Sequence, residues 1–359
     1  MSNSSFVTVR GKRFHYIWLR DRCLSDKSRH PDSWEKLAQE SEHISSPEPL
    51  SIEERDEKLI IEWNENPPHR SIFPISWLLR HAYDPQPQSS SEEIILWDKA
   101  KLEAKPIEIY DANSTNVSLW ISQLFTLGFV ILSNLKAENL DSFLSSIGSI
   151  RDTEYGKIVT ATVGKGLSST VKALPPHNDL TYCSSHRLVQ FIYCSENHAT
   201  GGESLVVDGF HVAQKFRQDY PDYFKILVET PLNFWRVQHE HQYFFNSNQT
   251  IIELDRDSNL TAIRFSQKNC MPHLPFEQIE SFYQAYTAFS RYMNNLDYRY
   301  CFRLQAGECL LMQNFRILHG RTAFDPNSGS REMRVGYIDW DYFLARHFYQ
   351  QEFNANQIN

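Results

Sequence analysis

The chain has 359 residues, of which 41% are hydrophobic and 22% charged, so it is long enough for two domains and is not a disordered chain. Its 36 lysines and arginines against 44 acidic residues give a net charge of −8, and an acidic surface disfavours binding to nucleic acid or anionic lipid because it repels phosphate. No apolar run reaches the roughly 18 residues that a membrane span needs.

The first 90 residues are predicted to form a small β-rich module. Short apolar or alternating runs separated by turn residues are typical of strands, and three of them lie here: residues 6–10, 14–18 and 59–63. Residues 84–91, Asp-Pro-Gln-Pro-Gln-Ser-Ser-Ser, have the composition of an exposed connector. We therefore expect a first domain over residues 1–90 and a second over residues 91–359.

Residues 91–359 are predicted to form a double-sheet β structure with helices at its flank. Two segments have apolar residues at helical spacing, 118–127 and 275–293, and Gly128 follows the first where a helix C-cap would lie. Four buried strands are expected at residues 129–132, 188–194, 204–207 and 307–312. The fold class is therefore mainly β with helical decoration (α+β).

Residues 175–179, Pro-Pro-His-Asn-Asp, give the first strong indication of a metal site. On an extended segment His177 and Asp179 project to the same side, because side-chain direction alternates with period two. A third ligand must come from elsewhere, and His319, just after a predicted strand, is the candidate. Two imidazoles and one carboxylate leave coordination positions open, as in non-haem Fe(II) oxygenases, whereas a structural zinc site has four protein ligands.

A His-x-Asp pair alone is a weak signal in a chain with 14 histidines and 44 acidic residues, and Arg331 strengthens it. A guanidinium presents a planar fork to a carboxylate, so Arg331 would hold the far end of a keto acid bound to the metal. The alternative is a surface arginine next to the loop at residues 325–330; together with the three ligands, the anion-binding role is favoured. Eleven other histidines are interpreted as core or surface residues: His15, His30, His69, His81, His186, His198, His211, His239, His241, His273 and His347.

Five segments occur in a characteristic order: Trp18–Cys23, Thr200–Ser204, Val207–Gly209, Asn314–Arg321 and Tyr337–Asp341. Taken together, they resemble the motifs of the Fe(II)/2-oxoglutarate-dependent dioxygenases of the taurine-dioxygenase (TauD/TfdA-like) superfamily. The similarity is to the γ-butyrobetaine and trimethyllysine hydroxylase branch, and it covers nearly the whole chain.

This resemblance implies a double-stranded β-helix (jelly-roll) catalytic domain that uses Fe(II), O2 and the cosubstrate 2-oxoglutarate. The implied metal and catalytic ligands are His177, Asp179 and His319. Arg331 is expected to hold the C5 carboxylate of 2-oxoglutarate, and Thr200 and Arg321 of the matching motifs are also assigned to cosubstrate binding. Members of the branch often form homodimers, so a homodimer is expected here as well.

Three tyrosines are predicted to contact the substrate: Tyr155, Tyr182 and Tyr337. γ-Butyrobetaine hydroxylases surround a trimethylammonium group with aromatic rings, each contributing about 0.5–2 kcal/mol. Tyr337 and Tyr155 match two positions of that cage, but the other two fall near Val159 and Ser169, which are not aromatic. This departure favours a different ligand, such as an amino acid or a tailored metabolite.

A second departure lies in the N-terminal module, where relatives carry a structural zinc bound by three cysteines and a histidine. The matching stretch here reads Cys23-Leu-Ser25-Asp-Lys-Ser28, with His69 in the distal place. Serine hydroxyls are poor zinc ligands compared with thiolates. No structural zinc is therefore expected.

The chain is expected to be a cytoplasmic protein. Its N-terminal sequence lacks the apolar core of a signal peptide. The six cysteines are scattered without a Cys-x-x-Cys pair, which favours reduced thiols over a disulfide framework: Cys23, Cys183, Cys194, Cys270, Cys301 and Cys309.

The predicted activity is oxidation of an unactivated C–H bond, most simply hydroxylation, in a small polar amine or amino-acid-like metabolite. 2-Oxoglutarate is decarboxylated to succinate and CO2 in the same turnover. A natural-product tailoring oxygenase that desaturates or cyclises its substrate is the alternative within the family. A non-catalytic binding protein on the same fold is the alternative of another class, and a zinc hydrolase is disfavoured because no motif places a general base.

Overall fold

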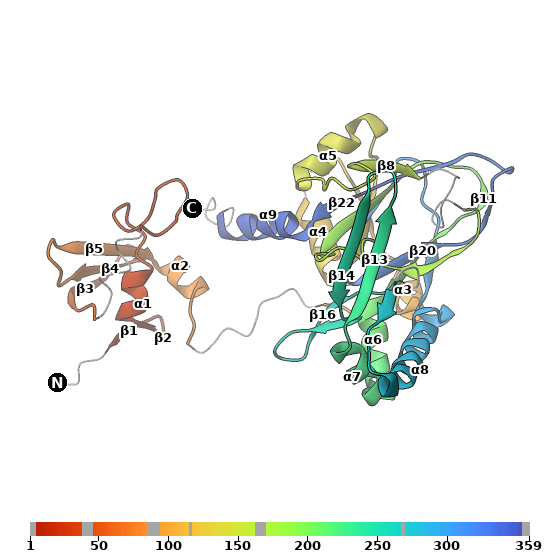
Figure 1. The fold of residues 1–359 in the computed structure, drawn as a ribbon. Coiled ribbons are helices and arrows are strands. Elements are labelled where there is room, and N and C mark those ends of the chain that lie inside the picture. Colours follow the sequence, from red (N-terminus) through yellow and green to blue (C-terminus); the bar gives the residue numbers. More distant parts are fainter. Residues whose placement is uncertain are drawn as a thin grey trace. The chain divides into compact units, whose positions relative to one another are not determined.

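The computed structural model describes residues 5–37, 46–84, 94–114, 117–161, 170–266 and 270–353. The chain divides into two compact units, Met1–Ser91 and Glu92–Asn359 (Figure 1). Ser169, one of the two positions compared with the aromatic cage, lies outside the described residues.

The N-terminal unit contains a hairpin, a three-stranded antiparallel sheet and two short helices. In chain order these are β1 (Phe6–Val9), β2 (Lys12–His15), α1 (Tyr16–Asp21), β3 (Pro49–Arg55), β4 (Lys58–Trp63), β5 (His69–Pro74) and α2 (Ile75–Arg80). Strands are confirmed at residues 6–9 and 58–63. The predicted strand over residues 14–18 is wrong beyond His15, because Phe14, Trp18 and Leu19 reach the core at helical rather than alternating spacing.

The second unit is built on two antiparallel-rich sheets. The larger has the order β6-β7-β19-β10-β22-β8, and the smaller has the order β18-β12-β20-β9. Their strands are β6 (Ile109–Asp111), β7 (Phe129–Ser133), β8 (Ile158–Ala161), β9 (Leu174–His177), β10 (Leu188–Asn197), β12 (Ser204–Asp208), β18 (Tyr300–Phe302), β19 (Cys309–Gln313), β20 (Ile317–Arg321) and β22 (Arg331–Asp339). The four predicted buried strands are confirmed as β7, β10, β12 and β19.

Smaller sheets and helices complete this unit. Short strands form three further sheets: β11 (Thr200–Gly201) with β21 (Phe324–Asp325), β13 (Leu232–Gln238) with β14 (Tyr243–Gln249) and β17 (Cys270–Pro272), and β15 (Ile252–Leu254) with β16 (Leu260–Ile263). The helices are α3 (Lys99–Ala104), α4 (Val117–Leu127), α5 (Leu140–Ile147), α6 (Gly209–Asp219), α7 (Pro221–Glu229), α8 (Phe276–Met293) and α9 (Trp340–Phe353). None of these described helices is long and apolar enough to cross a membrane.

The inner faces of the two main sheets pack against each other, as in a jelly roll. One buried cluster joins Val206 and Ile317 of the smaller sheet to residues of the larger sheet, namely Phe129, Ile131, Leu310, Met312, Cys194 and Met333. Apolar side chains of both sheets meet between the layers, so burial of this surface holds them together. The mainly β, jelly-roll fold predicted from the sequence is confirmed.

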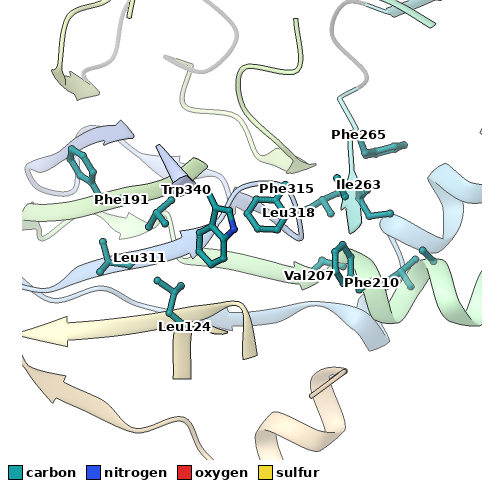
Figure 2. Packing of buried hydrophobic residues seen from close by; sticks show 14 of the residues in the cluster. Leu124, Phe191, Val207, Phe210, Ile263, Phe265, Leu311, Phe315, Leu318 and Trp340 are labelled. Carbon is teal, nitrogen blue, oxygen red and sulfur yellow. The ribbon is translucent and has the colours of Figure 1, made fainter. Parts of the chain in front are cut away.

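The outer faces of the sheets are covered by helices. Phe191 and Leu311 project to the opposite side of the larger sheet from the inner cluster and belong to a core that also contains Leu124 of α4. Val207 and Leu318 of the smaller sheet belong to the same core, together with Phe210 of α6 (Figure 2). Residues of α8 also belong to it. The helices therefore cover the outer faces of the two sheets.

Helix α4 ends where the sequence predicts. Gly128 donates its backbone N–H to Leu124 at 3.1 Å and has φ +84°, a left-handed conformation that glycine adopts without a steric penalty. A Cβ at this position would lie 2.8 Å from the Ile317 side chain. Gly128 thus both ends the helix and lets β20 pass closely.

Candidate metal and cosubstrate site

Three residues from separate parts of the chain meet at the edge of the smaller sheet. His319 on β20 pairs in register with His177 on β9, and the two imidazole rings lie 4.5 Å apart. Asp179 follows β9 by two residues. Its Oδ1 lies 3.3 Å from His177 Nε2, and its Oδ2 lies 3.5 Å from His319 Nε2. One ligand atom from each residue lies within 4.8 Å of the other two.

The expected extended segment does not reach Asp179, because β9 ends at His177. Asn178 is fully engaged by its surroundings: its N–H donates to Phe265 O at 2.9 Å, and its side chain accepts from the Phe265 N–H at 2.9 Å. Leu180 then adopts φ +53°. This anchored turn nevertheless brings the Asp179 carboxylate to the same side as the His177 ring.

Hydrogen bonds orient the imidazole of His177. Its Nδ1 lies 2.9 Å from the carbonyl oxygen of Pro175, which can only accept, so Nδ1 carries the proton. In the neutral ring this leaves the Nε2 lone pair directed at Asp179 and His319, the tautomer a metal ligand requires.

The Asp179 carboxylate is held from the larger sheet. Gln190 Nε2 and the Tyr337 hydroxyl both donate to its Oδ2, each at 2.8 Å. Gln190 and Tyr337 are direct neighbours across β10 and β22. Burial raises the pKa of Tyr337 well above its ordinary value, and the Asp179 charge adds to the shift, so the phenol keeps the proton that it donates.

This donor set fits Fe(II). Two imidazoles and a carboxylate on one side of a site, with the opposite side open, suit a non-haem ferrous ion, and no fourth His, Cys, Asp or Glu joins the group among the described residues. Hydrogen bonds to the side chains that would coordinate the metal are the supporting contacts that tune such sites.

Arg331 lies on the inner face of the larger sheet. It begins β22, and residues 331, 333, 335 and 337 share one face, the face from which Tyr337 reaches Asp179. Burial lowers the pKa of Arg331 to about 10, and the nearby Arg321 adds to the shift. Among the described residues no carboxylate lies within 4.0 Å of its guanidinium, whose Nη2 donates to Gly202 O at 3.4 Å. A partly buried cation of this kind fits a bound carboxylate.

Arg321 and Thr200 occupy different environments. Arg321 shares a face of β20 with His319, and its Nη1 donates to Lys172 O at 3.0 Å while its Nη2 donates to Thr170 O. Its guanidinium lies 4.9 Å from the centre of the Phe324 ring, and that of Arg331 lies 5.3 Å from the same centre. Thr200 is exposed on β11, where its N–H donates to Ser328 at 2.7 Å. In the described part of the chain, no hydrogen bond joins Thr200 to the three metal-site residues.

Ser204 is a polar residue of this region that sequence reasoning missed. It is buried at the start of β12 and lies opposite Arg321 in register, so its side chain shares the face that carries His319. A single hydroxyl opening the apolar run Ser204-Leu-Val-Val is the signal that would have identified it.

The three predicted substrate tyrosines gather near the metal-site residues. Tyr182 packs against the buried cluster that includes Tyr337, and its hydroxyl donates to Glu154. Tyr155 is more exposed and accepts a hydrogen bond from Arg236. Burial raises the pKa of Tyr155, Arg236 opposes this shift, and the carboxylates of Glu154 and Asp179 add to it. Glu154 and Arg236 were not predicted from the sequence.

The N-terminal unit gathers the residues compared with a zinc site. Cys23 Sγ lies 3.2 Å from His69 Nε2 and 3.3 Å from Ser25 Oγ, and Ser28 Oγ lies 3.4 Å from the same imidazole nitrogen. Hydrogen bonds thus join the four side chains. The expectation that this unit folds without zinc stays a prediction.

A jelly roll whose sheets bring two histidines and one aspartate together defines the class of non-haem iron oxygenases. The sequence profile of the taurine catabolism dioxygenase TauD, TfdA family matches residues 99–337, more than half of the chain, and the chain belongs to this family. It is a 2-oxoglutarate-dependent dioxygenase that uses Fe(II), and the family predicted from the sequence is confirmed.

Relatives align over most of the chain. A gamma-butyrobetaine dioxygenase of Pseudomonas sp. (strain AK-1) is 28% identical over 352 residues, covering 93% of this chain and 89% of the relative. The mitochondrial trimethyllysine dioxygenase of Homo sapiens is 24% identical over 347 residues, covering 92% of this chain and 81% of the relative. The crystal structure of AAD-2 in complex with Mn(II) and N-oxalylglycine shares the fold, with a TM-score of 0.51 and 12% identity over 65% of this chain and 93% of that one.

Proposed function

We propose that His177, Asp179 and His319 hold the ferrous ion and that Arg331 holds the C5 carboxylate of 2-oxoglutarate. In this proposal the enzyme oxidises an unactivated C–H bond of a small polar amine or amino-acid-like metabolite, most simply by hydroxylation. The observation that carries the proposal is the approach of the three ligand atoms to within 4.8 Å of one another.

The chain's own groups prepare this site. Pro175 fixes the tautomer of His177, while Gln190 and Tyr337 hold Asp179 Oδ2 and leave Oδ1 facing His177 Nε2. Arg331 supplies a charge-assisted fork for a dicarboxylate that is anchored at its other end. The iron, when bound, supplies the O2-activating chemistry that a protein side chain lacks.

An amine substrate is supported by the relatives and by the aromatic side chains. Two relatives are named for gamma-butyrobetaine and trimethyllysine. Tyr182 and Tyr337 lie in one cluster beside Asp179, and rings of this kind attract ammonium groups. Val159, by contrast, pairs with Val335 between β8 and β22. The position compared with one aromatic residue of the cage therefore carries no ring.

We further propose that the protein is cytoplasmic and homodimeric. All six cysteines are free thiols, which supports a reducing compartment. The homodimer is supported by the resemblance to the γ-butyrobetaine hydroxylase branch. Light scattering on the purified protein at micromolar concentration measures the mass directly, and a monomer would contradict the homodimer.

The function is tested by loading the protein with Fe(II) and 2-oxoglutarate without oxygen. We expect a weak visible absorption from the complex, followed by succinate formation when O2 and one of a panel of trimethylated and unmethylated amines are added. Asp179→Ala should abolish both signals, whereas the control Asp141→Ala, at an exposed position of α5, should retain them. Absence of the absorption in the unaltered protein would overturn the proposal.

A further inference from the structure

The loop between β9 and β10 carries one of the metal-site residues close to its start. Residues 178–187 form this connection, and Asp179 is the second of them. Leu180, the next residue, has φ +53°, a left-handed conformation that is strained for leucine. A strained backbone persists only where its surroundings hold it, so contacts from outside the loop must fix the chain next to Asp179.

The buried side chain of Asn314 holds the backbone of Asp179 on both sides. Asn314 Oδ1 accepts the N–H of Asp179 at 3.0 Å, and Asn314 Nδ2 donates to the Asp179 carbonyl at 2.9 Å. The same Nδ2 donates to the His186 carbonyl at 3.3 Å, at the far end of the loop. The backbone N–H of Asn314 donates to Leu188 O at 2.9 Å, where β10 begins. One residue thus closes the loop at both ends.

A second buried asparagine returns the contact. Asn178 Nδ2 donates to the carbonyl of Asn314 and, at 3.3 Å, to that of Ile317, the first residue of β20. Both amides use their donor and acceptor atoms, so turning either amide over would bring like groups together. Because β20 also carries His319, the exchange ties the segment of Asp179 to the strand of the second histidine.

We propose that Asn314 is a positioning residue for the metal site: it fixes the peptide groups of Asp179 so that the carboxylate faces the two imidazoles. The inference rests on the proposed function and adds a residue that acts through the main chain of a metal ligand. Gln190 and Tyr337, by contrast, act on the carboxylate itself. A ligand must stay within about 0.5 Å of its productive position, which rotation of the adjoining peptide planes would not allow.

The affinity for Fe(II), measured by anaerobic titration calorimetry, tests this role. Asn314→Ala releases both peptide groups of Asp179, and we expect Fe(II) to bind about 10- to 100-fold more weakly. The matched control is Gln313→Ala, which removes another buried amide at the adjacent position. Gln313 Nε2 donates to the carbonyl of Leu124 in α4 at 2.9 Å, away from the metal-site residues, so the control should bind Fe(II) like the unaltered protein.

A second variant keeps the test open if Asn314→Ala does not fold. Asn314→Ser retains one polar group, and its affinity for Fe(II) should lie between those of the unaltered protein and Asn314→Ala. The loop also keeps an anchor in both variants. Arg264 Nη1 donates to the carbonyls of Thr181 and Cys183, at 2.6 and 2.8 Å.

The visible spectrum of bound Co(II) separates positioning from a merely structural role. The spectrum depends on how the ligands are arranged around the ion, whereas a change in stability alone leaves it unaltered. At saturating Co(II), we expect the spectra of the Asn314 variants to differ from that of the unaltered protein and that of Gln313→Ala to match it. Lower stability in urea with unchanged Fe(II) affinity and an unchanged Co(II) spectrum would make Asn314 a structural residue only and overturn the inference.

Metal binding by the unaltered protein gives the independent reading. If this protein binds Fe(II) and shows the visible absorption with 2-oxoglutarate, but the Asn314 variants do the same with equal affinity, the positioning role is refuted and the proposed function stands. If the unaltered protein does not bind Fe(II), the proposed function fails, and this inference fails with it.

Discussion

Gln190 reaches across the jelly roll to hold one oxygen of Asp179. Its Nε2 donates to Asp179 Oδ2 at 2.8 Å and also lies 3.4 Å from His319 Nε2. Gln190 belongs to the larger sheet, whereas His319 belongs to the smaller one, so this amide connects the two layers at the site.

Removing that amide should weaken metal binding. Gln190→Leu leaves Asp179 Oδ2 with the Tyr337 hydroxyl as donor, and loss of such a supporting contact commonly costs about 10- to 100-fold in metal affinity. Anaerobic calorimetry with Fe(II) measures the change. Gln278→Leu, at an exposed position of α8, is the control, and equal affinities of the two variants would contradict the supporting role of Gln190.

Replacing Arg331 should affect the cosubstrate and not the metal. Arg331→Gln removes the charge, and loss of a charge-assisted hydrogen-bonded pair of about 1.5–3 kcal/mol corresponds to a KM for 2-oxoglutarate raised about 10- to 100-fold. Arg331→Lys keeps the charge but loses the planar fork of the guanidinium. Its KM for 2-oxoglutarate should therefore lie between those of the unaltered enzyme and Arg331→Gln. Succinate formation at varied 2-oxoglutarate measures KM, with Arg334→Gln as control; an unchanged KM would exclude Arg331 from the cosubstrate site.

The second unit should be sensitive to the loss of one partner of a buried ion pair. Asp208 and Arg316 are both 0% exposed, and Arg316 Nη2 donates to Asp208 Oδ2 at 2.8 Å. Asp208 also caps α6 through the N–H groups of Phe210 and His211. Asp208→Asn leaves the arginine charge uncompensated and should cost about 3–5 kcal/mol. Urea unfolding measures the loss, and the exposed control Asp222→Asn should change stability by less than about 0.5 kcal/mol.

Local patterns predicted the strands of the two main sheets well. The four runs are mostly apolar, and each became a strand of a main sheet. Residue types and their order also singled out His177, Asp179 and His319, which lie together in the structure. Their role as metal ligands stays a prediction. The prediction of a strand over residues 14–18 was wrong because the apolar residues there fit both the strand period and the helix period. Only the packing around Phe14 decides between the two.

Side chains whose role depends on a contact with a residue distant in sequence could not be predicted in this way. Gln190 is a single polar residue within an apolar strand, and nothing near it in sequence names Asp179 as its partner. Arg236 lies 81 residues from Tyr155, which it contacts. Such pairs are defined by sheet register and hairpin placement, which depend on the whole fold.

The Cys23 thiol should make the stability of the N-terminal unit depend on pH. Burial alone would raise the pKa of Cys23, but hydrogen bonds with His69, Ser25 and Ser71 lower it from 9.0 to about 6. The folded state therefore binds the thiol proton more weakly than the unfolded chain. The resulting stabilisation is fully present above pH 9.0 and is lost as the pH falls through about 6.

Cys23→Ala should remove this dependence. The difference in free energy of unfolding between the unaltered protein and the variant should grow as the pH rises from about 6 to 9.0 and then level off. Thiolate absorbance in the ultraviolet should titrate near pH 6 and move to higher pH in His69→Ala, because the imidazole no longer stabilises the anion. Cys301→Ala is the control, because Cys301 is exposed and its pKa is raised and not lowered. If Cys23 titrates at the ordinary pKa of a cysteine thiol, the contact with His69 does not lower its pKa, and the prediction is refuted.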